Sequence, residues 1–463
     1  MIEFYHKNFK SNYKIKVKQL IMDLGRLFHL EQIKLKRSTS VFLDEKYHDG
    51  ISPEDWSKIN DQYYTLDLNK GQLSKTLSKF KIKQEDAKNV KYSFIDTFAG
   101  CGGLSVGLSK AGFNPVLVNE IESKFLETYY FNHDLALDSY YCGDIKDLVD
   151  GEVVSNKSYE EIDLVAGGPP CQGFSMANRQ RILDDPRNNL YQQFLRLLAK
   201  TRPKFFLMEN VKGMMNKSEE ILGNFKNALG EDYSMRMILL NAKNYGVPQN
   251  RERVFVIGTR LIEVNMDQLI KDILVHESNT KQFVLKDVLR GLPKLHPKKQ
   301  KNIRGVENEK IGFKFTNPID NHTDYSSFIG EKSEYLNNHT NRYNNDRDVE
   351  IFNRLPQGAN SLHESIADIM PYSNRNHMFK DKYYKLNELE VSKTITSHMK
   401  FDCNMYIHPT QSRGLSPREA ARVQTFPDDF VFMGSNNTWY AQIGNAVPVK
   451  LAEAIGKEII KYL

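Results

Sequence analysis

The sequence predicts an α/β fold built around a parallel sheet. From Ser93 onward, short apolar runs alternate with segments long enough to form helices, as in strand–helix–strand units. A glycine-rich stretch follows the first apolar run, and acidic residues end the next two. The expected strands cover residues 93–98, 115–121, 141–145, 162–168 and 204–211, followed by two closely spaced strands at 236–242 and 253–259.

The last two expected strands are joined by the turn-rich link "KNYGVPQNRE", which is compatible with a hairpin at the sheet edge. Helical patterns return near the C-terminus. In "SPREAARVQTF", Ser416 suits the N-cap and Pro417 the first turn. In "VPVKLAEAIGKEIIKYL", apolar residues at helical spacing share one face: Leu451, Ile455 and Ile459.

Composition sets the broad class of the protein. A chain of 463 residues, 40% hydrophobic and 26% charged, is typical of a soluble globular protein with two or three domains. No apolar run is long enough to span a membrane, and the N-terminus lacks the apolar core of a signal peptide, which predicts a cytoplasmic protein. No CxxC pair occurs, so neither a disulfide framework nor a metal site is expected at the four cysteines: Cys101, Cys142, Cys171 and Cys403.

The net charge is concentrated at the N-terminus. Residues 1–92 contain 18 Lys and Arg against 12 Asp and Glu, which accounts for the whole formal charge of +6. Such a basic extension could face a polyanion and add nonspecific electrostatic affinity for it. A solvated helical surface, or a helical cap on the next domain, explains the same count.

The chain divides into four stretches by pattern. The basic extension, residues 1–92, precedes the strand–helix region at 93–258. Residues 259–412 are polar, rich in Asn, Lys, His and Tyr over 296–347, and without a sustained period, so they are expected to form a separate irregular domain. Residues 413–463 are expected to return to the first domain.

The glycine-rich loop and two acidic residues indicate a nucleoside-containing cofactor. In "FIDTFAGCGGLSVGL", Gly100, Gly102 and Gly103 permit a tight turn and close approach to a ligand. Glu120 ends the second strand, where a carboxylate can bind ribose hydroxyls, and Asp144 ends the third, where it can accept from an adenine amino group. Neither GxGxxG nor a phosphate-binding P-loop is present, which favours an adenosyl cofactor without phosphates. Acidic surface residues at strand ends are the alternative.

Cys171 in "DLVAGGPPCQGFS" has the position of a nucleophile. Pro169 and Pro170 stiffen the chain before it, and it follows the carboxyl end of the fourth expected strand rather than lying within the apolar run. A thiolate needs a polar or cationic environment, for which Arg179, Arg181 and Arg187 are candidates. An exposed loop cysteine is the alternative.

Five blocks in order identify a family resemblance. "FIDTFAGCGG", "PPCQGFS", "MENVKGM", "QNRERVFVIG" and "QIGNAVPV" closely resemble the DNA cytosine-5 methyltransferase family, in its unpermuted order. The resemblance covers about residues 94–258 and 414–456. It implies a Rossmann-like S-adenosylmethionine-dependent methyltransferase sheet, a small irregular target recognition domain and an N-terminal extension.

The resemblance implies a reaction and assigns residues to it. Cysteine addition at carbon 6 of cytosine makes carbon 5 nucleophilic towards the methyl group of S-adenosylmethionine. Cys171 would be this nucleophile, Glu209 would serve ring nitrogen 3, and Arg253 would hold the base. A strand-end carboxylate in a salt bridge is the alternative for Glu209, and Asn210 and Val211 are expected beside it. The implied cofactor-binding set is Phe98, Gly100, Gly102, Gly103, Glu120, Asp144, Pro169, Asn445 and Val447.

The implied substrate is double-stranded DNA with the target cytosine rotated out of the helix, because carbon 5 is out of reach within a duplex. Ser175, Arg179, Arg187 and Arg251 are the expected DNA contacts, although Arg251 could instead be structural. The stretch expected to read the sequence lies between about Gly358 and Tyr384, and it gives no recognition sequence. A monomer is expected, and a cognate restriction endonuclease is a possible partner.

Two other functions compete with this interpretation. An RNA cytosine-5 methyltransferase could use the same catalytic scaffold, but that group carries a Cys-Phe-Thr tripeptide which this chain lacks. A non-enzymatic DNA-binding regulator could retain the fold, but Cys171, Glu209 and Arg253 are all present.

Overall fold

The computed structural model describes residues 92–133, 135, 139–151, 162–170, 189–298, 323–330, 336–371 and 382–463. These residues divide into two compact units. The first contains the described parts of Asp86–Gln282 together with Ala446–Leu463, and the second those of Phe283–Asn445. The expectations for the basic N-terminal extension lie outside the described residues, apart from Tyr92.

The units differ in their boundaries from the expected domains. Residues 259–282 belong to the first unit rather than to the irregular region, because Leu269 and Ile273 of one helix are buried in the core against the sheet. Residues 413–445 belong to the second unit rather than to the catalytic stretch, because their charged side chains are paired within that unit.

The first unit is built on a seven-stranded sheet in the order β3-β2-β1-β4-β5-β8-β6. The pairs from β3 to β5 are parallel, and β8 pairs antiparallel with both β5 and β6. The expected α/β class is confirmed, and each expected strand is present within about three residues. The strands are β1 (Tyr92–Thr97), β2 (Phe113–Glu120), β3 (Tyr140–Cys142), β4 (Leu164–Gly167), β5 (Phe205–Val211), β6 (Ser234–Asn241) and β8 (Glu252–Thr259).

The sheet is mixed rather than parallel throughout, because β6 and β8 form the expected hairpin. Asn241 pairs with Glu252 and Ser234 with Thr259, so the connection is too short for the crossover that parallel strands need. It contains a 3₁₀ turn, η7 (Ala242–Tyr245), and the two-residue strand β7 (Gln249–Asn250).

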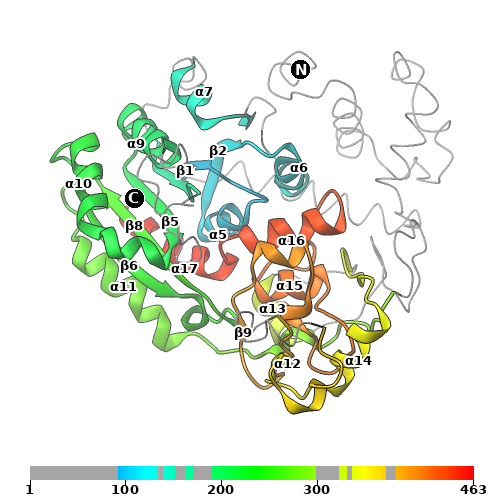
Figure 1. Cartoon of the computed structure of the whole chain (residues 1–463). Helices are drawn as coiled ribbons and strands as arrows, with labels where there is room; N and C mark the ends of the chain where they lie inside the picture. Colours follow the sequence, from blue (N-terminus) through cyan, green and yellow to red (C-terminus); the bar gives the residue numbers. More distant parts are fainter. Residues whose placement is uncertain are drawn as a thin grey trace, which may run out of the picture. The chain divides into compact units, whose positions relative to one another are not determined.

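Helices cover both faces of the sheet (Figure 1). Alternate strand residues enter opposite core layers: Phe94 packs with α5, α11 and α17, whereas its neighbour Ile95 packs with α7, α9 and α10. The helices of this unit are α5 (Gly103–Ala111), α6 (Ser123–Asn132), α7 (Ile145–Asp150), α9 (Asn189–Thr201), α10 (Ser218–Leu229), α11 (Met266–Asn279) and α17 (Val449–Ile460), with a 3₁₀ segment η6 (Lys212–Lys217) after β5.

Helices α5 and α17 cross at two glycines. A Cβ atom added to Gly107 would lie 2.5 Å from both the Val449 carbonyl oxygen and the Ala452 Cβ, and one added to Gly456 would lie 2.8 Å from the Ala111 Cβ. The absence of side chains at these positions therefore lets the helix that follows the glycine loop pack directly on the C-terminal helix. The predicted apolar face of α17 is confirmed, since Leu451, Ile455 and Ile459 are fully buried.

The second unit is held together by short helices and buried polar groups. Its apolar cluster includes Ile351, Phe352, Ile366, Tyr383 and Ile407. Its regular elements are α12 (Leu285–Leu289), α13 (Asp324–Ile329), α14 (Asp346–Arg354), η8 (Glu364–Ile366), β9 (Ser392–Lys393), η10 (Ser397–Lys400), η11 (Asn404–Tyr406), α15 (Pro417–Val423) and α16 (Asn436–Asn445).

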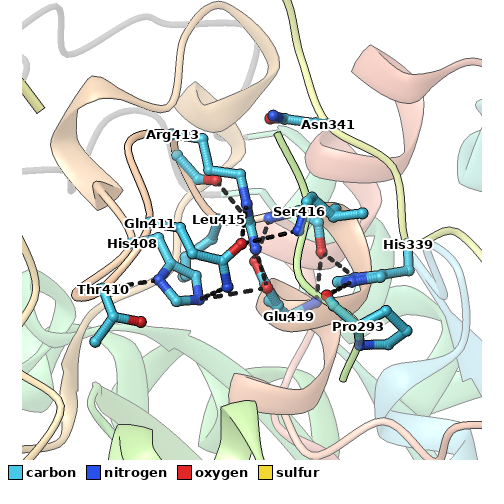
Figure 2. Close-up of polar contacts among 12 residues, drawn as sticks. Pro293, His339, Asn341, His408, Thr410, Gln411, Arg413, Leu415, Ser416 and Glu419 are labelled. Carbon is cyan, nitrogen blue, oxygen red and sulfur yellow. Dashed lines mark hydrogen bonds and ion pairs between the residues drawn. The ribbon is translucent and has the colours of Figure 1, made fainter. Parts of the chain in front are cut away.

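The start of α15 confirms the expected N-cap and adds a buried charge network (Figure 2). The Ser416 amide donates to the Glu419 carboxylate at 2.7 Å, and the Glu419 amide donates to the Ser416 hydroxyl oxygen. Arg413 donates to both Glu419 oxygens, at 2.7 and 2.6 Å. All three side chains are almost fully buried, so the network fixes one geometry of this unit.

Two buried histidines flank the same carboxylate. The His339 Nε2 atom lies 2.9 Å from the Pro293 carbonyl oxygen, which can only accept, so this nitrogen carries the hydrogen and Nδ1 accepts from Ser416. The His408 Nε2 atom lies 3.6 Å from the Glu419 carboxylate. Burial lowers the pKa of His339 to about 4 and that of His408 to about 3, so both rings are neutral at physiological pH.

No helix in the described part of the chain is both long and apolar enough to cross a membrane.

We expect Gly107→Val to lower the free energy of unfolding by about 1–3 kcal/mol, because the added atoms would collide with the backbone of α17. Gly223→Ala is the matched control: it lies within α10, where an added Cβ meets nothing within 4 Å, and should stabilise by up to about 1 kcal/mol. Urea unfolding of both variants measures the difference. A Gly107→Val variant as stable as the wild type would contradict the close crossing.

We expect His339 and His408 to destabilise the protein progressively as the pH decreases from about 6.5 towards 4, in opposition to buried carboxyls with raised pKa values such as Asp96. An unfolded histidine binds a proton near pH 6.5, whereas folded His339 and His408 resist protonation, so the unfolded state is favoured by up to about 1.4 kcal/mol per pH unit for each ring. Urea unfolding at several pH values measures this slope. His339→Gln should reduce it, whereas replacing the exposed His398 by Gln should not; equal slopes in both variants would refute the assignment.

Candidate active site

The site lies at the edge of the sheet where the five strands from β3 to β5 end. Because four consecutive pairings among these strands are parallel, the loop after β1, Glu120 of β2, Asp144 after β3 and Pro169 after β4 all leave the sheet at the same edge. Ligands of open α/β sheets bind at this edge.

The glycine loop turns tightly after β1, as its glycines predict. Phe98, Gly100 and Gly102 all have positive φ angles, of 54°, 58° and 96°. The Gly102 amide donates to the Ala99 carbonyl at 2.9 Å, and Gly102 is the N-cap of α5. A Cβ at Gly100 would face open space, so the backbone here is accessible to a ligand.

Glu120 holds the loop from the neighbouring strand. Its carboxylate accepts from the Gly100 amide at 2.7 Å and from the Glu122 amide at 2.8 Å. The side chain is only 7% exposed, and burial raises its pKa. The structure therefore brings Glu120 and the loop together, as the order of the strands predicts.

Asp144 and Ile121 complete this side of the edge. Asp144 caps α7 by accepting from the Lys146 amide at 2.9 Å, so one carboxylate oxygen already has a structural role. Ile121 follows Glu120 and is 64% exposed. Sequence reasoning did not identify this exposed apolar side chain, although its position directly after a strand-end carboxylate is visible in the sequence.

Glu209 and Arg253 form an ion pair on adjacent strands. The Arg253 Nε atom lies 2.9 Å from Glu209 Oε1, and the side chains are 16% and 14% exposed. This environment is compatible with both interpretations of Glu209, as the group that serves ring nitrogen 3 and as a strand-end carboxylate in a salt bridge. In both cases the carboxylate lies at a strand end next to β4, beside a cation that binds it. A Cβ at Gly168 would lie 3.0 Å from Glu209 Oε2, so the glycine provides the space that the carboxylate occupies.

Asn210 connects this pair with the proline turn. Its buried amide donates to the Pro169 carbonyl at 3.0 Å, and its oxygen accepts from the Val211 amide. The approach to position 171 is therefore held by β5 as well as by the prolines. Cys171 itself lies outside the described residues, as do the expected DNA contacts Ser175, Arg179 and Arg187.

Arg251 is in the interior of the first unit rather than on a DNA-facing surface. It is 1% exposed and donates to the Ala446 carbonyl at 3.0 Å. This placement argues against the expected DNA contact, because a buried guanidinium cannot reach a phosphate, and it fits the structural alternative. A buried arginine cannot be told from an exposed one by its spacing along the strand.

The two C-terminal cofactor candidates differ in environment. Val447 is 7% exposed and packs in the core of the first unit, and Asn445 ends α16 in the second unit with an exposed side chain. Their cofactor contacts stay a prediction. Within the described ranges, no group of three or more His, Cys, Asp or Glu side chains is arranged to hold a metal ion.

Comparisons with known proteins agree with this geometry. The family described as C-5 cytosine-specific DNA methylase matches residues 92–461. Type II methyltransferase M1.HphI of Haemophilus parahaemolyticus is 32% identical over 80% of this chain and 87% of its own length. Type II methyltransferase M.DdeI of Desulfomicrobium norvegicum is 32% identical over 80% and 89%.

A solved structure supports the same relationship. A chain from E. coli described as a DNA modification methyltransferase encoded within a prophage matches with a TM-score of 0.62 and 26% identity, covering 80% of this chain and 99% of that one.

We expect Gly168→Ala to destabilise the protein by about 1 kcal/mol or more, because the added methyl group would crowd the Glu209 carboxylate. In a Glu209→Ala background the same change should cost almost nothing, since the crowded atoms are gone. Urea unfolding of the four combinations gives the coupling energy. Additive effects would show that Gly168 and Glu209 do not share this space.

Proposed function

Since the chain belongs to the C-5 cytosine-specific DNA methylase family and is a DNA (cytosine-5-)-methyltransferase, we propose that Cys171, Glu209 and Arg253 carry its reaction. The observation that supports this most directly is the Glu209–Arg253 ion pair of 2.9 Å, formed beside Gly168 and the proline turn that leads to Cys171.

Cys171 attacks carbon 6 of the target cytosine as a thiolate, and the new carbon–sulfur bond turns the ring into an enamine whose carbon 5 accepts the methyl group. Removal of the proton from carbon 5 then expels the cysteine and restores the aromatic ring. The cysteine is a nucleophile in the first step and a leaving group in the last, so it is regenerated in each cycle.

Glu209 and Arg253 stabilise the charge that the addition creates. Glu209 holds a proton at ring nitrogen 3, and Arg253 binds the carbonyl side of the base. In the structure these two side chains bind each other, so the entering base exchanges part of this ion pair for contacts of its own. The pair also keeps the Glu209 carboxylate in one orientation before the base arrives.

The residues of the glycine loop fit an adenosyl cofactor. The family implies S-adenosylmethionine, which supplies the methyl group from its sulfonium. The loop offers open space at Gly100, the Glu120 carboxylate for ribose hydroxyls and the exposed Ile121 for the adenine face. Phe98, Gly102, Gly103, Asp144, Pro169, Asn445 and Val447 complete the proposed set.

The proposed substrate is duplex DNA with the target cytosine rotated out of the helix. Ser175, Arg179 and Arg187 contact the opened strand, and residues from about 358 to 384 read the sequence. Arg251 is left out of the proposed contacts because it is buried. The relatives named as type II methyltransferases favour a role in which this protein protects DNA from a cognate restriction endonuclease.

We expect Cys171→Ala to abolish methyl transfer to duplex DNA, whereas the wild type should form a stable covalent adduct on DNA containing 5-fluorocytosine, whose carbon 5 cannot release a proton. Glu209→Gln should retain the shape of the site but lower the rate of adduct formation by about 100-fold or more. Gel electrophoresis of the adduct and transfer of labelled methyl groups measure the two steps.

A transfer RNA substrate assayed in parallel separates the alternatives. Methylation of RNA but not DNA would identify an RNA methyltransferase, and DNA binding without methyl transfer would identify a regulator. Full activity of Cys171→Ala would refute the mechanism.

A further inference from the structure

A buried chain of polar groups lies under the glycine loop. Asp96 of β1 is fully buried, and its Oδ2 accepts from the Ser105 hydroxyl of α5. The Ser105 oxygen lies 2.6 Å from the Tyr129 hydroxyl of α6. Because serine gives its one hydrogen to Asp96, Tyr129 donates to serine. Three elements around the loop are thus joined by one directed chain.

The loop backbone rests on the end of this chain. A Cβ at Gly102 would lie 2.7 Å from the His133 ring and 2.9 Å from the Tyr129 ring. These two rings stack on each other, with centroids 3.9 Å apart and planes inclined by 19°. Gly102 lies over this stack with a φ of 96°, so the position of Tyr129 sets the position of the loop.

The other oxygen of Asp96, Oδ1, is buried and has no hydrogen-bond partner. An ionised carboxylate with so few partners is unfavourable in the interior, and a bound proton relieves that cost. Burial raises the pKa of Asp96 to about 7; the Ser105 hydrogen bond opposes this and the Glu120 charge adds to it.

Few charged groups face Asp96. Among the described residues, the titratable groups recorded against it are Glu120 of β2, Tyr129 of α6 and Cys101 of the loop. On the other side β4 contributes Ala166, which does not titrate. Burial raises the pKa of both Tyr129 and Cys101, so they are neutral at physiological pH, and Glu120 is the neighbour whose charge raises the pKa of Asp96.

We propose that Asp96 is a positioning residue that gives up its proton when the cationic cofactor binds at the glycine loop, so that cofactor binding and proton release are linked. This inference rests on the proposed placement of S-adenosylmethionine. The sulfonium favours an ionised carboxylate nearby. The proton passes from the Asp96 carboxyl to solvent, and no other bond forms or breaks. Ser105 and Tyr129 then transmit the charge of Asp96 to the loop.

Calorimetry of S-adenosylmethionine binding to the full chain between pH 5.5 and 8 tests the proposal. The wild-type affinity is divided by the affinity of Asp96→Asn at each pH, which removes the titration of the ligand. This ratio should be about tenfold lower at pH 6 than at pH 8. Ser105→Ala should move the midpoint to higher pH, because the serine hydrogen bond favours the ionised carboxyl. A merely structural role would weaken binding equally at all pH values and would overturn the proposal.

Two controls make the assignment specific. Asp163→Asn removes another buried carboxylate, which binds the Ser93 amide and Lys204 at the opposite end of the same sheet, and should retain the pH dependence. Glu120→Gln tests the neighbouring carboxylate: a slope that survives in Asp96→Asn and disappears in Glu120→Gln would overturn the assignment to Asp96.

Infrared spectroscopy of the wild type gives a second readout that does not require a folded Asp96→Asn variant. The wild type should show a protonated carboxyl band at pH 6 that is lost when S-adenosylmethionine is added. A band unaffected by the cofactor, while calorimetry shows binding, refutes the linkage and leaves the proposed function intact. Absence of binding at every pH refutes the proposed cofactor site, and with it this inference.

Discussion

The parallel pairing of β1 with β2 and β4 is the constraint on which the site depends. It directs the glycine loop, Glu120 and Pro169 to one edge of the sheet, and the next parallel pair adds Glu209. Once these strands are paired, the Gly100 amide lies within reach of the Glu120 carboxylate without any further adjustment, at 2.7 Å. The proposed cofactor side and the proposed base side of the site are therefore products of one topology.

The antiparallel edge adds the cation that the parallel strands lack. At the ends of the described parallel strands, the charged side chains proposed for the site are all acidic. Arg253 instead comes from β8, which pairs with β5 in the opposite direction. A short hairpin between β6 and β8 makes this possible, and Arg251, which directly precedes β8, is buried and donates to the Ala446 carbonyl. The change in strand direction thus has a chemical consequence, because it places a guanidinium beside a carboxylate that needs charge compensation.

Local sequence signals predicted the regular elements well, and buried polar groups poorly. The N-cap at Ser416, the apolar face of α17 and the run of strands follow from residue type and spacing, which act over a few residues. Arg251 was left open between a DNA contact and a structural role, because its partner Ala446 lies 195 residues away in the chain. The Asp96–Ser105 and Arg413–Glu419 contacts are close in sequence, but they were missed because their burial is made by the surrounding fold. The polar residues around His339 indicated an irregular domain and gave no sign of a buried network, yet His339 is 1% exposed. Polarity alone does not distinguish a surface from a satisfied interior network.

The two units use buried charge in different ways, and the difference follows from how completely each charge is satisfied. Glu419 accepts from two Arg413 nitrogens and from the Ser416 amide, so it stays ionised, and the pairing lowers its pKa despite burial. Such a satisfied network contributes little net stability but favours one arrangement over its competitors. Asp96 has a single donor and a second oxygen without a partner, so its charge is poorly compensated. A carboxyl in that condition responds to a nearby cation, whereas a saturated one cannot. Incomplete satisfaction beneath the glycine loop is therefore the physical property that would make the first unit sensitive to its cofactor, and full satisfaction is what holds the frame of the second unit constant.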